Sequence, residues 1–119
     1  MRKLLAACCF VLFAYITPLH AQFLNPVTAK TGPYVSAGSG QYALSINSAT
    51  SLTVPAGSYI AEICVEGQAA RYKDDGGTPT TSSGIPVAAG TCFQYAGPLK
   101  TFQIIGVTSG ATIDVSYYQ

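Results

Sequence analysis

Hydrophobic and polar side chains alternate in short runs from residue 41 onward, and residues that favour turns close each run. The clearest run is SYIAEICVEG, residues 58–67. Successive side chains of a β-strand point to opposite faces, so this alternation predicts a strand with one apolar face and one polar face. The residues expected on the core face are Tyr59, Ala61, Ile63 and Val65.

The rest of the chain repeats this pattern, with Ala89-Gly90, Gly97-Pro98 and Ser109-Gly110 as predicted turns. Tyr42, Leu44 and Ile46 are expected to share a face, and further strands are marked by Leu52 and Val54; Ile85 and Val87; Phe93 and Tyr95; Phe102 and Ile104; and Ile113, Val115 and Tyr117. No convincing helical period of 3.6 accompanies them. Many short strands at even spacing predict an all-β fold: a single small antiparallel β-sandwich or jelly-roll-like domain over residues 41–119.

The N-terminal residues have the layout of a secretory signal peptide. Arg2 and Lys3 precede an apolar run, residues 4–16, and then Pro18 and Ala21. That run of about 13 residues is shorter than the roughly 20 that span a membrane. We therefore expect residues 1–21 to be a cleaved signal peptide and residues 22–40 to form an irregular arm. The mature protein would be exported, to the periplasm or the medium, with no stable membrane anchor.

Cleavage would leave two cysteines, Cys64 and Cys92, in an oxidising compartment. One disulfide is the simplest expectation, joining neighbouring strands or covering the outer face of a sheet, because each cysteine alternates with bulky apolar residues. Closing a loop of nearly thirty residues would stabilise the fold by about 3 kcal/mol on the chain-entropy model. The alternative is two unpaired cysteines that act as small hydrophobic residues.

Charge and composition exclude several functions. Residues 22–119 carry four cationic and five acidic side chains, too few cations to neutralise a run of phosphates, so we expect no nucleic-acid partner. The only histidine, His20, lies in the leader, which leaves a serine or cysteine nucleophile without its usual base and a zinc site without its usual ligand. Glu62 and Glu66 share a strand face, but four residues of strand separate them by about 13 Å, beyond the roughly 5 to 9.5 Å of glycosidases. We expect no catalytic residues, no cofactor and no metal.

The stretch RYKDDGGTPT, residues 71–80, is the most polar part of the pattern. Adjacent Asp74 and Asp75 do not fit an EF-hand, which needs acidic residues at alternating positions and a later glutamate. Asp followed by two glycines favours a turn, so we expect a solvated loop, with a cation site as the alternative. Exposed tyrosines could form a platform for sugar or protein, and alternation turns Tyr118 away from the face of Tyr117. The candidate interaction surface comprises Arg71, Asp74, Asp75 and Tyr118.

From about Cys64 onward the chain resembles short β-rich proteins encoded in tailed phages and prophages, often beside capsid genes. The resemblance lies in ARYKDDGGTPTTSSGIPVAAG, FQYAGPLKTFQIIG and ATIDVSYY. Its shared positions are Arg71, Asp74, Asp75, Gly76, Gly84 and Pro86. This resemblance implies a small virion component, without known catalysis, that decorates capsids or forms fibres.

A second resemblance is to chaperone-usher pilin subunits, which have a signal peptide, a cysteine pair, a sandwich fold and an ending similar to Tyr118-Gln119. The sequence therefore predicts a non-enzymatic structural or interaction protein, exported or carried on a virion, that binds protein partners or assembles with itself. The first expectation is a virion surface component of phage or prophage type. The alternatives are an exported bacterial surface or pilin-like subunit and a secreted carbohydrate- or receptor-binding module.

Overall fold

The computed structural model describes residues 34–119. The predicted signal peptide and most of the predicted arm lie outside the described residues. Within them, no helix is long and apolar enough to cross a membrane. The described elements are β1 (Gln41–Ser45), β2 (Thr50–Ser51), β3 (Ile60–Glu66), β4 (Ala70–Lys73), β5 (Ile85–Val87), β6 (Cys92–Tyr95), the 3-10 turn η1 (Leu99–Thr101), β7 (Gln103–Gly106) and β8 (Thr112–Tyr118).

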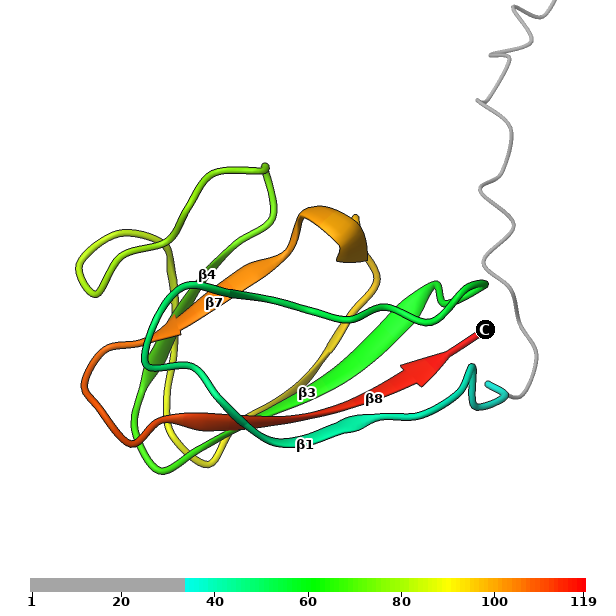
Figure 1. Ribbon diagram of the computed structural model, residues 1–119, viewed down its shortest axis with the longest axis horizontal. Helices are drawn as coiled ribbons and strands as arrows, with labels where there is room; N and C mark the ends of the chain where they lie inside the picture. The colour runs from blue at the N-terminus through cyan, green and yellow to red at the C-terminus, as the bar shows by residue number, and fades with distance from the viewer. Residues whose placement is uncertain (1–33) are drawn as a thin grey trace, which may run out of the picture. The chain divides into compact units, whose positions relative to one another are not determined.

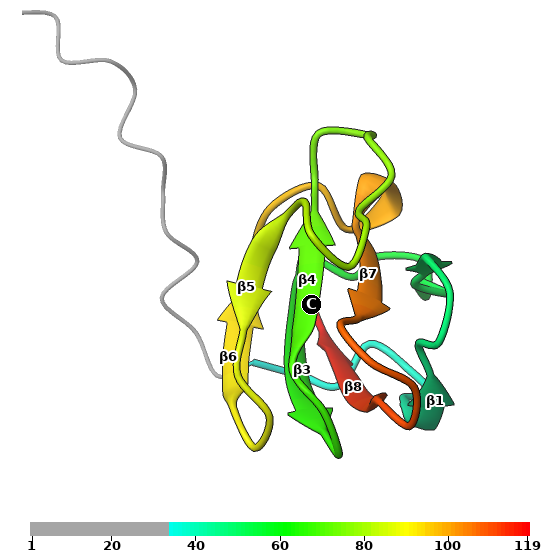
Figure 2. The ribbon, with the colours of Figure 1, turned by 90° about the vertical axis from the view of Figure 1, so that its left-hand side faces the viewer.

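The strands of residues 34–119 form two four-stranded sheets, in the orders β1-β8-β3-β6 and β2-β7-β4-β5 (Figures 1 and 2). All pairings are antiparallel, and β1 pairs with β8, β2 with β7, β3 with β6 and β4 with β5. These are the pairs that form when one long hairpin is rolled up, so that β8 also meets β3 and β7 also meets β4. This arrangement is a jelly roll. The predicted all-β fold is confirmed.

The core lies between the two sheets, where the alternating apolar faces meet. Ala61, Ile63 and Val65 of β3 are fully buried, as are Ile113 and Val115 of β8. The core face predicted for Ala61, Ile63 and Val65 is therefore confirmed, and the alternating apolar set of β8 also faces the core. Both strands lie inside their sheet, so each has neighbours on either side and a whole face covered by the opposite layer.

Tyr59 does not belong to the core face predicted for it, because its side chain is 65% exposed. It precedes β3, which begins at Ile60, at the end of the sandwich. There it lines a hollow together with connecting loops instead of facing the opposite sheet. Alternation gives the direction of a side chain but not the point at which the covering sheet ends.

Four aromatic rings connect the two sheets. Phe102, which is fully buried just before β7, has its ring centroid 4.9 Å from that of Tyr72 on β4 and 4.9 Å from that of Tyr95 on β6. Tyr72 also stacks on Phe93 of β6 at 5.6 Å. We call Tyr72, Phe93, Tyr95 and Phe102 the aromatic cluster. It packs side chains of β6 against side chains of the other sheet.

A bulge in β1 reverses part of the predicted pattern. The register with β8 shifts between Gln41 and Leu44, and Ala43 has a positive φ of 50°. As a result Tyr42 is 68% exposed and does not share the inward face of Leu44 and Ile46. Gln41 turns inward instead, and its Oε1 accepts hydrogen bonds from the Tyr117 hydroxyl at 2.6 Å and from the Thr53 N–H at 2.9 Å.

The predicted disulfide is confirmed between Cys64 and Cys92, which lie 28 residues apart in the chain. The two cysteines are directly opposite each other on β3 and β6. Cys64 alternates with buried Ile63 and Val65, so the bond lies on the outer face of the sheet. It ties β6, the last strand of its sheet, to a central strand.

Candidate functional site on the outer face of a sheet

Three tyrosines from separate parts of the chain gather on the outer face of the β1-β8-β3-β6 sheet. Tyr118 points outward from β8, and its ring centroid lies 6.2 Å from that of Tyr34, which is 52% exposed. Tyr42 lies over the same face, since its hydroxyl is 3.5 Å from the Oγ of Ser116 on β8. We call Tyr34, Tyr42 and Tyr118 the tyrosine face.

Backbone contacts from distant segments position these rings. Val35 and Gln119 exchange backbone hydrogen bonds of 3.3 and 2.9 Å, and the Ala37 N–H donates to the Tyr117 carbonyl at 2.8 Å. The segment that carries Tyr34 therefore runs along the end of β8. The bulge positions Tyr42, because the Ala43 N–H donates to Oδ1 of Asp114 at 2.6 Å.

Carboxylates accompany the tyrosines on this face. Glu62 lies beside Tyr118, whose hydroxyl donates to Glu62 Oε2 at 3.3 Å. Asp114 accepts the Ala43 N–H, and Glu66 is exposed at the end of β3. An ionised carboxylate has about four acceptor positions on its two oxygens, so Glu62 and Asp114 can each accept further hydrogen bonds. The face thus combines aromatic surface with hydrogen-bond acceptors.

The four residues of the sequence-predicted interaction surface do not come together. Tyr118 belongs to the tyrosine face, whereas Arg71 points outward from the other sheet, where its NH1 donates to the Gly84 carbonyl at 3.0 Å. Asp74 turns inward, and its Oδ2 accepts a hydrogen bond from the Tyr95 hydroxyl at 2.9 Å. Asp75 is exposed and accepts the Gly77 N–H at 2.8 Å.

The two adjacent aspartates therefore have different roles in the loop after β4. Asp75 closes a local turn of the kind expected for Asp followed by glycine. Asp74 fixes the base of the loop, because its carbonyl also accepts the Thr101 hydroxyl at 2.8 Å. In the part of the chain that the structure describes, no three Asp, Glu, Cys or His side chains are grouped so that they could hold a metal ion.

Two hollows are lined by residues other than those of the tyrosine face. The larger, of about 540 Å³, is bounded by residues 54–59 and by Ala96, Gly97, Leu99 and Lys100. The smaller, of about 320 Å³, lies between β5 and β6 and is lined mainly by apolar side chains, among them Tyr72, Ile85 and Phe93. Among residues 34–119, no carboxylate lines either hollow, so these residues offer there no pair of acidic groups of the kind that glycoside hydrolysis uses.

Two buried tyrosines make the domain sensitive to alkaline pH. Burial raises the pKa of Tyr117 from 10.0 to about 12. Burial, and then the hydrogen bond to Asp74, raise the pKa of Tyr95 above its ordinary value as well. A tyrosine whose pKa is higher in the folded state contributes its full stabilisation below the unfolded pKa and loses it as the pH rises through the folded pKa. We expect the free energy of unfolding, measured by urea denaturation, to fall between about pH 10 and 12.

The control for this prediction is Tyr117→Phe, which removes the titrating hydroxyl but keeps the ring. It should make the fall in the free energy of unfolding at alkaline pH shallower. It also removes the hydrogen bond to Gln41 at every pH. If the free energy of unfolding of Tyr117→Phe falls with pH as steeply as that of the wild type, the Tyr117 hydroxyl is not the group responsible.

The outer face of the β1-β8-β3-β6 sheet is therefore the region where chemically distinctive side chains from several segments meet. Aromatic rings with polar tips and carboxylates suit the binding of a partner, since both offer directional contacts as well as apolar area. Comparison with protein-family models, with curated proteins and with solved structures finds no match for the chain.

Proposed function

We propose that the protein is a non-enzymatic structural or interaction protein, and that its tyrosine face binds a protein partner on the surface of a phage- or prophage-type particle. The observation that carries this proposal is the gathering of Tyr34, Tyr42 and Tyr118 from distant segments onto one sheet face. Tyrosine is enriched at protein interfaces because its ring supplies contact area and its hydroxyl supplies a hydrogen bond.

The fold and the disulfide support this reading. Jelly rolls serve as viral capsid domains and as lectin domains, although a fold alone does not determine a function. A disulfide persists in oxidising surroundings, which suits a protein displayed outside the cytoplasm. A sheet stiffened by a cross-strand disulfide also holds surface residues in fixed positions, as a decoration or fibre protein requires.

The placement of the acidic groups supports a role without catalysis. Glu62 and Glu66 lie on one face of β3, where four residues of strand separate them by about 13 Å. Asp74 is engaged by Tyr95, and Asp75 is held in a local turn. Glu62 and Asp114, diagonal neighbours at about 7 to 8 Å, are closer together, but each already accepts a hydrogen bond, from the Tyr118 hydroxyl and from the Ala43 N–H.

A pilin-like subunit is less well supported than a particle component. Pilin assembly adds a strand from one subunit to the open sheet of the next. Here β8 lies between β1 and β3 of the same chain, and the segment around Val35 continues the edge beside β8. This part of the sheet already has its neighbours.

A secreted carbohydrate- or receptor-binding module is the second candidate, and the same face supports it. Aromatic rings can stack on the apolar faces of sugars, and Glu62 and Asp114 can accept hydrogen bonds from sugar hydroxyls. Lectin domains also use jelly rolls. The two candidates differ in whether the partner is a protein on a particle or a glycan.

The test is the double variant Tyr42→Ser with Tyr118→Ser in the full chain, followed by mass spectrometry of particles and medium. We expect the wild type in purified particles and at least about tenfold less of the variant, since a few aromatic anchors carry most of the energy of an interface. Thermal melting should show that the variant is folded.

Tyr59→Ser is the matched control. Tyr59 is 65% exposed, close to the 68% of Tyr42, but it lies at the end of the sandwich. It should remain in particles at the wild-type level. Wild-type protein found only free in the medium would rule out the particle role. If a glycan array then shows binding that the double variant loses, the carbohydrate-binding candidate replaces it.

A further inference from the structure

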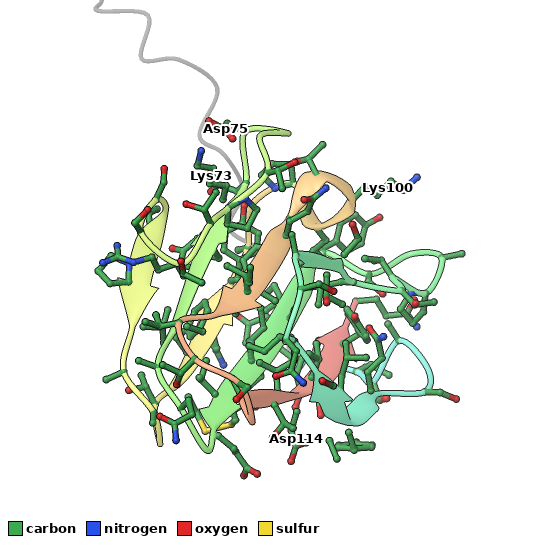
Figure 3. All side chains as sticks on the ribbon, turned by 60° about the vertical axis from the view of Figure 1, so that its left-hand side comes forward. Lys73, Asp75, Lys100 and Asp114 are labelled. Atoms are coloured by element: carbon green, nitrogen blue, oxygen red, sulfur yellow. A yellow bond between two sulfur atoms is a disulfide. The ribbon has the colours of Figure 1, made fainter. Side chains whose placement is uncertain are left out.

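Charged side chains are segregated between the two outer faces of the sandwich. Among the described strands, the β1-β8-β3-β6 sheet carries Glu62, Glu66 and Asp114 and no lysine or arginine. The β2-β7-β4-β5 sheet carries Arg71 and Lys73 and no carboxylate. In Figure 3 the labelled Asp114 and Lys73 lie on opposite sides of the domain.

The cationic side has a defined shape, which we call the basic face. Arg71 and Lys73 point outward from β4, because Ala70 is buried and Tyr72 packs in the aromatic cluster. The Arg71 guanidinium is held by its bond to Gly84, which leaves further donors in its planar fork. Its strand neighbours are Ile105 on β7 and Pro86 on β5, so apolar surface borders the cations.

The loop that follows β4 only partly offsets this positive charge. Asp74 turns inward to the Tyr95 hydroxyl. Asp75 lies at the loop near Lys73 and holds the Gly77 N–H (Figure 3). Both carboxylates lie beyond the end of the strand, so the face formed by the strands of this sheet remains cationic.

The spacing of the two charge sets matches. Arg71 and Lys73 are two residues apart on one face of a strand, which separates them by about 7 Å. Asp114 lies opposite Cys64, which makes it the diagonal neighbour of Glu62 at about 7 to 8 Å. Two cations of one face could therefore meet two carboxylates of the other at the same time. A tyrosine ring beside them is also a favourable partner for a guanidinium.

We propose that copies of this chain stack head to tail, with the tyrosine face of one copy on the basic face of the next. This inference rests on the proposed function, in which the tyrosine face binds a protein partner, and it names that partner as a second copy. Contact between two different faces leaves one face of each kind free at the ends. Such a contact grows into a row of copies or closes into a ring.

The experiment measures the mass of the purified, disulfide-bonded protein by sedimentation across a concentration series at about 20 mM and about 500 mM salt. We expect larger species at low salt and dissociation at high salt, because screening weakens contacts between exposed charges. Glu62→Lys and Lys73→Glu should each weaken association at least about tenfold. Melting curves should show that both variants are folded, and Asp114→Asn and Arg71→Gln provide a second pair if one is not.

Mixing Glu62→Lys with Arg71→Gln tests the head-to-tail arrangement itself. Glu62→Lys keeps an intact basic face, and Arg71→Gln keeps an intact tyrosine face. Mixed in equal amounts, they should form a one-to-one dimer that does not grow further. A contact between two identical faces would give no such dimer, and that result would overturn the arrangement.

The outcomes separate this inference from the proposed function. Wild-type protein that stays monomeric at low salt overturns the stacking. If the protein is nevertheless present in particles, and its presence there depends on Tyr42 and Tyr118, the partner is a different protein and the proposed function stands. Protein that stacks but is absent from particles supports the stacking and removes the particle role.

Discussion

Replacing Phe102 with alanine is expected to bring the domain close to unfolding. The Phe102 side chain is fully buried and packs against Tyr72 and Tyr95, each at a ring-centroid distance of 4.9 Å. Removal of a buried phenylalanine side chain costs about 3 to 5 kcal/mol, because apolar contacts are lost and a cavity remains. Small domains have only about 5 to 15 kcal/mol of total stability. Urea denaturation followed by circular dichroism would measure the loss.

Two variants serve as controls for this result. Phe102→Leu keeps much of the volume and should cost clearly less. Tyr42→Ala removes a larger aromatic side chain from a position that is 68% exposed, and it should change stability by less than about 1 kcal/mol. A loss below about 1 kcal/mol in Phe102→Ala would contradict a central role for the aromatic cluster.

Removal of the disulfide is the second change with a large expected effect. The double variant Cys64→Ser with Cys92→Ser opens a covalent link between residues 28 apart in the chain. On the chain-entropy model the unfolded state then gains freedom that destabilises the fold by about 3 kcal/mol. The loss should appear as a lower urea midpoint, with β6 released first because it is the end strand of its sheet.

Reduction of the wild type is the matched control for this variant. A phosphine reductant should lower the urea midpoint of the wild type to that of the double variant and should leave the variant unchanged. In protein without residues 1–21, which carry Cys8 and Cys9, free thiols should number two in the unfolded, reduced form and none in the unfolded, oxidised form. Equal stability of the oxidised and reduced forms would show that the bond adds nothing to the fold.

Local alternation was sufficient to predict the interior of the sheets. Ile63 and Val115 lie on strands with neighbours on both sides. Along these strands, buried side chains therefore alternate regularly with side chains on the outer face. The same alternation gave the outward direction of Tyr118. It did not reveal which strands share a sheet, because strand pairing in a jelly roll joins segments far apart in the chain. The segregation of charge therefore could not be predicted.

The parts of the candidate site that were missed depend on contacts with distant segments. Tyr42 turns outward because of the bulge at Ala43, and the Ala43 N–H bonds to Asp114, 71 residues away. An alanine gives no local sign of a positive φ. Asp74 and Asp75 are neighbours in an apparently solvated stretch, yet Asp74 turns inward because Tyr95, on the other sheet, offers its hydroxyl.

The place of β8 has a consequence for the synthesis of this protein. It is the last of the described strands to leave the ribosome, yet it lies between β1 and β3 and forms the middle of its sheet. The sheet cannot close around an absent central strand, so the earlier strands must wait as an open chain until translation has passed Tyr118. A polypeptide that is still unfolded is narrow enough to pass through a translocation channel. While it is unfolded it is also exposed to proteases and depends on chaperones.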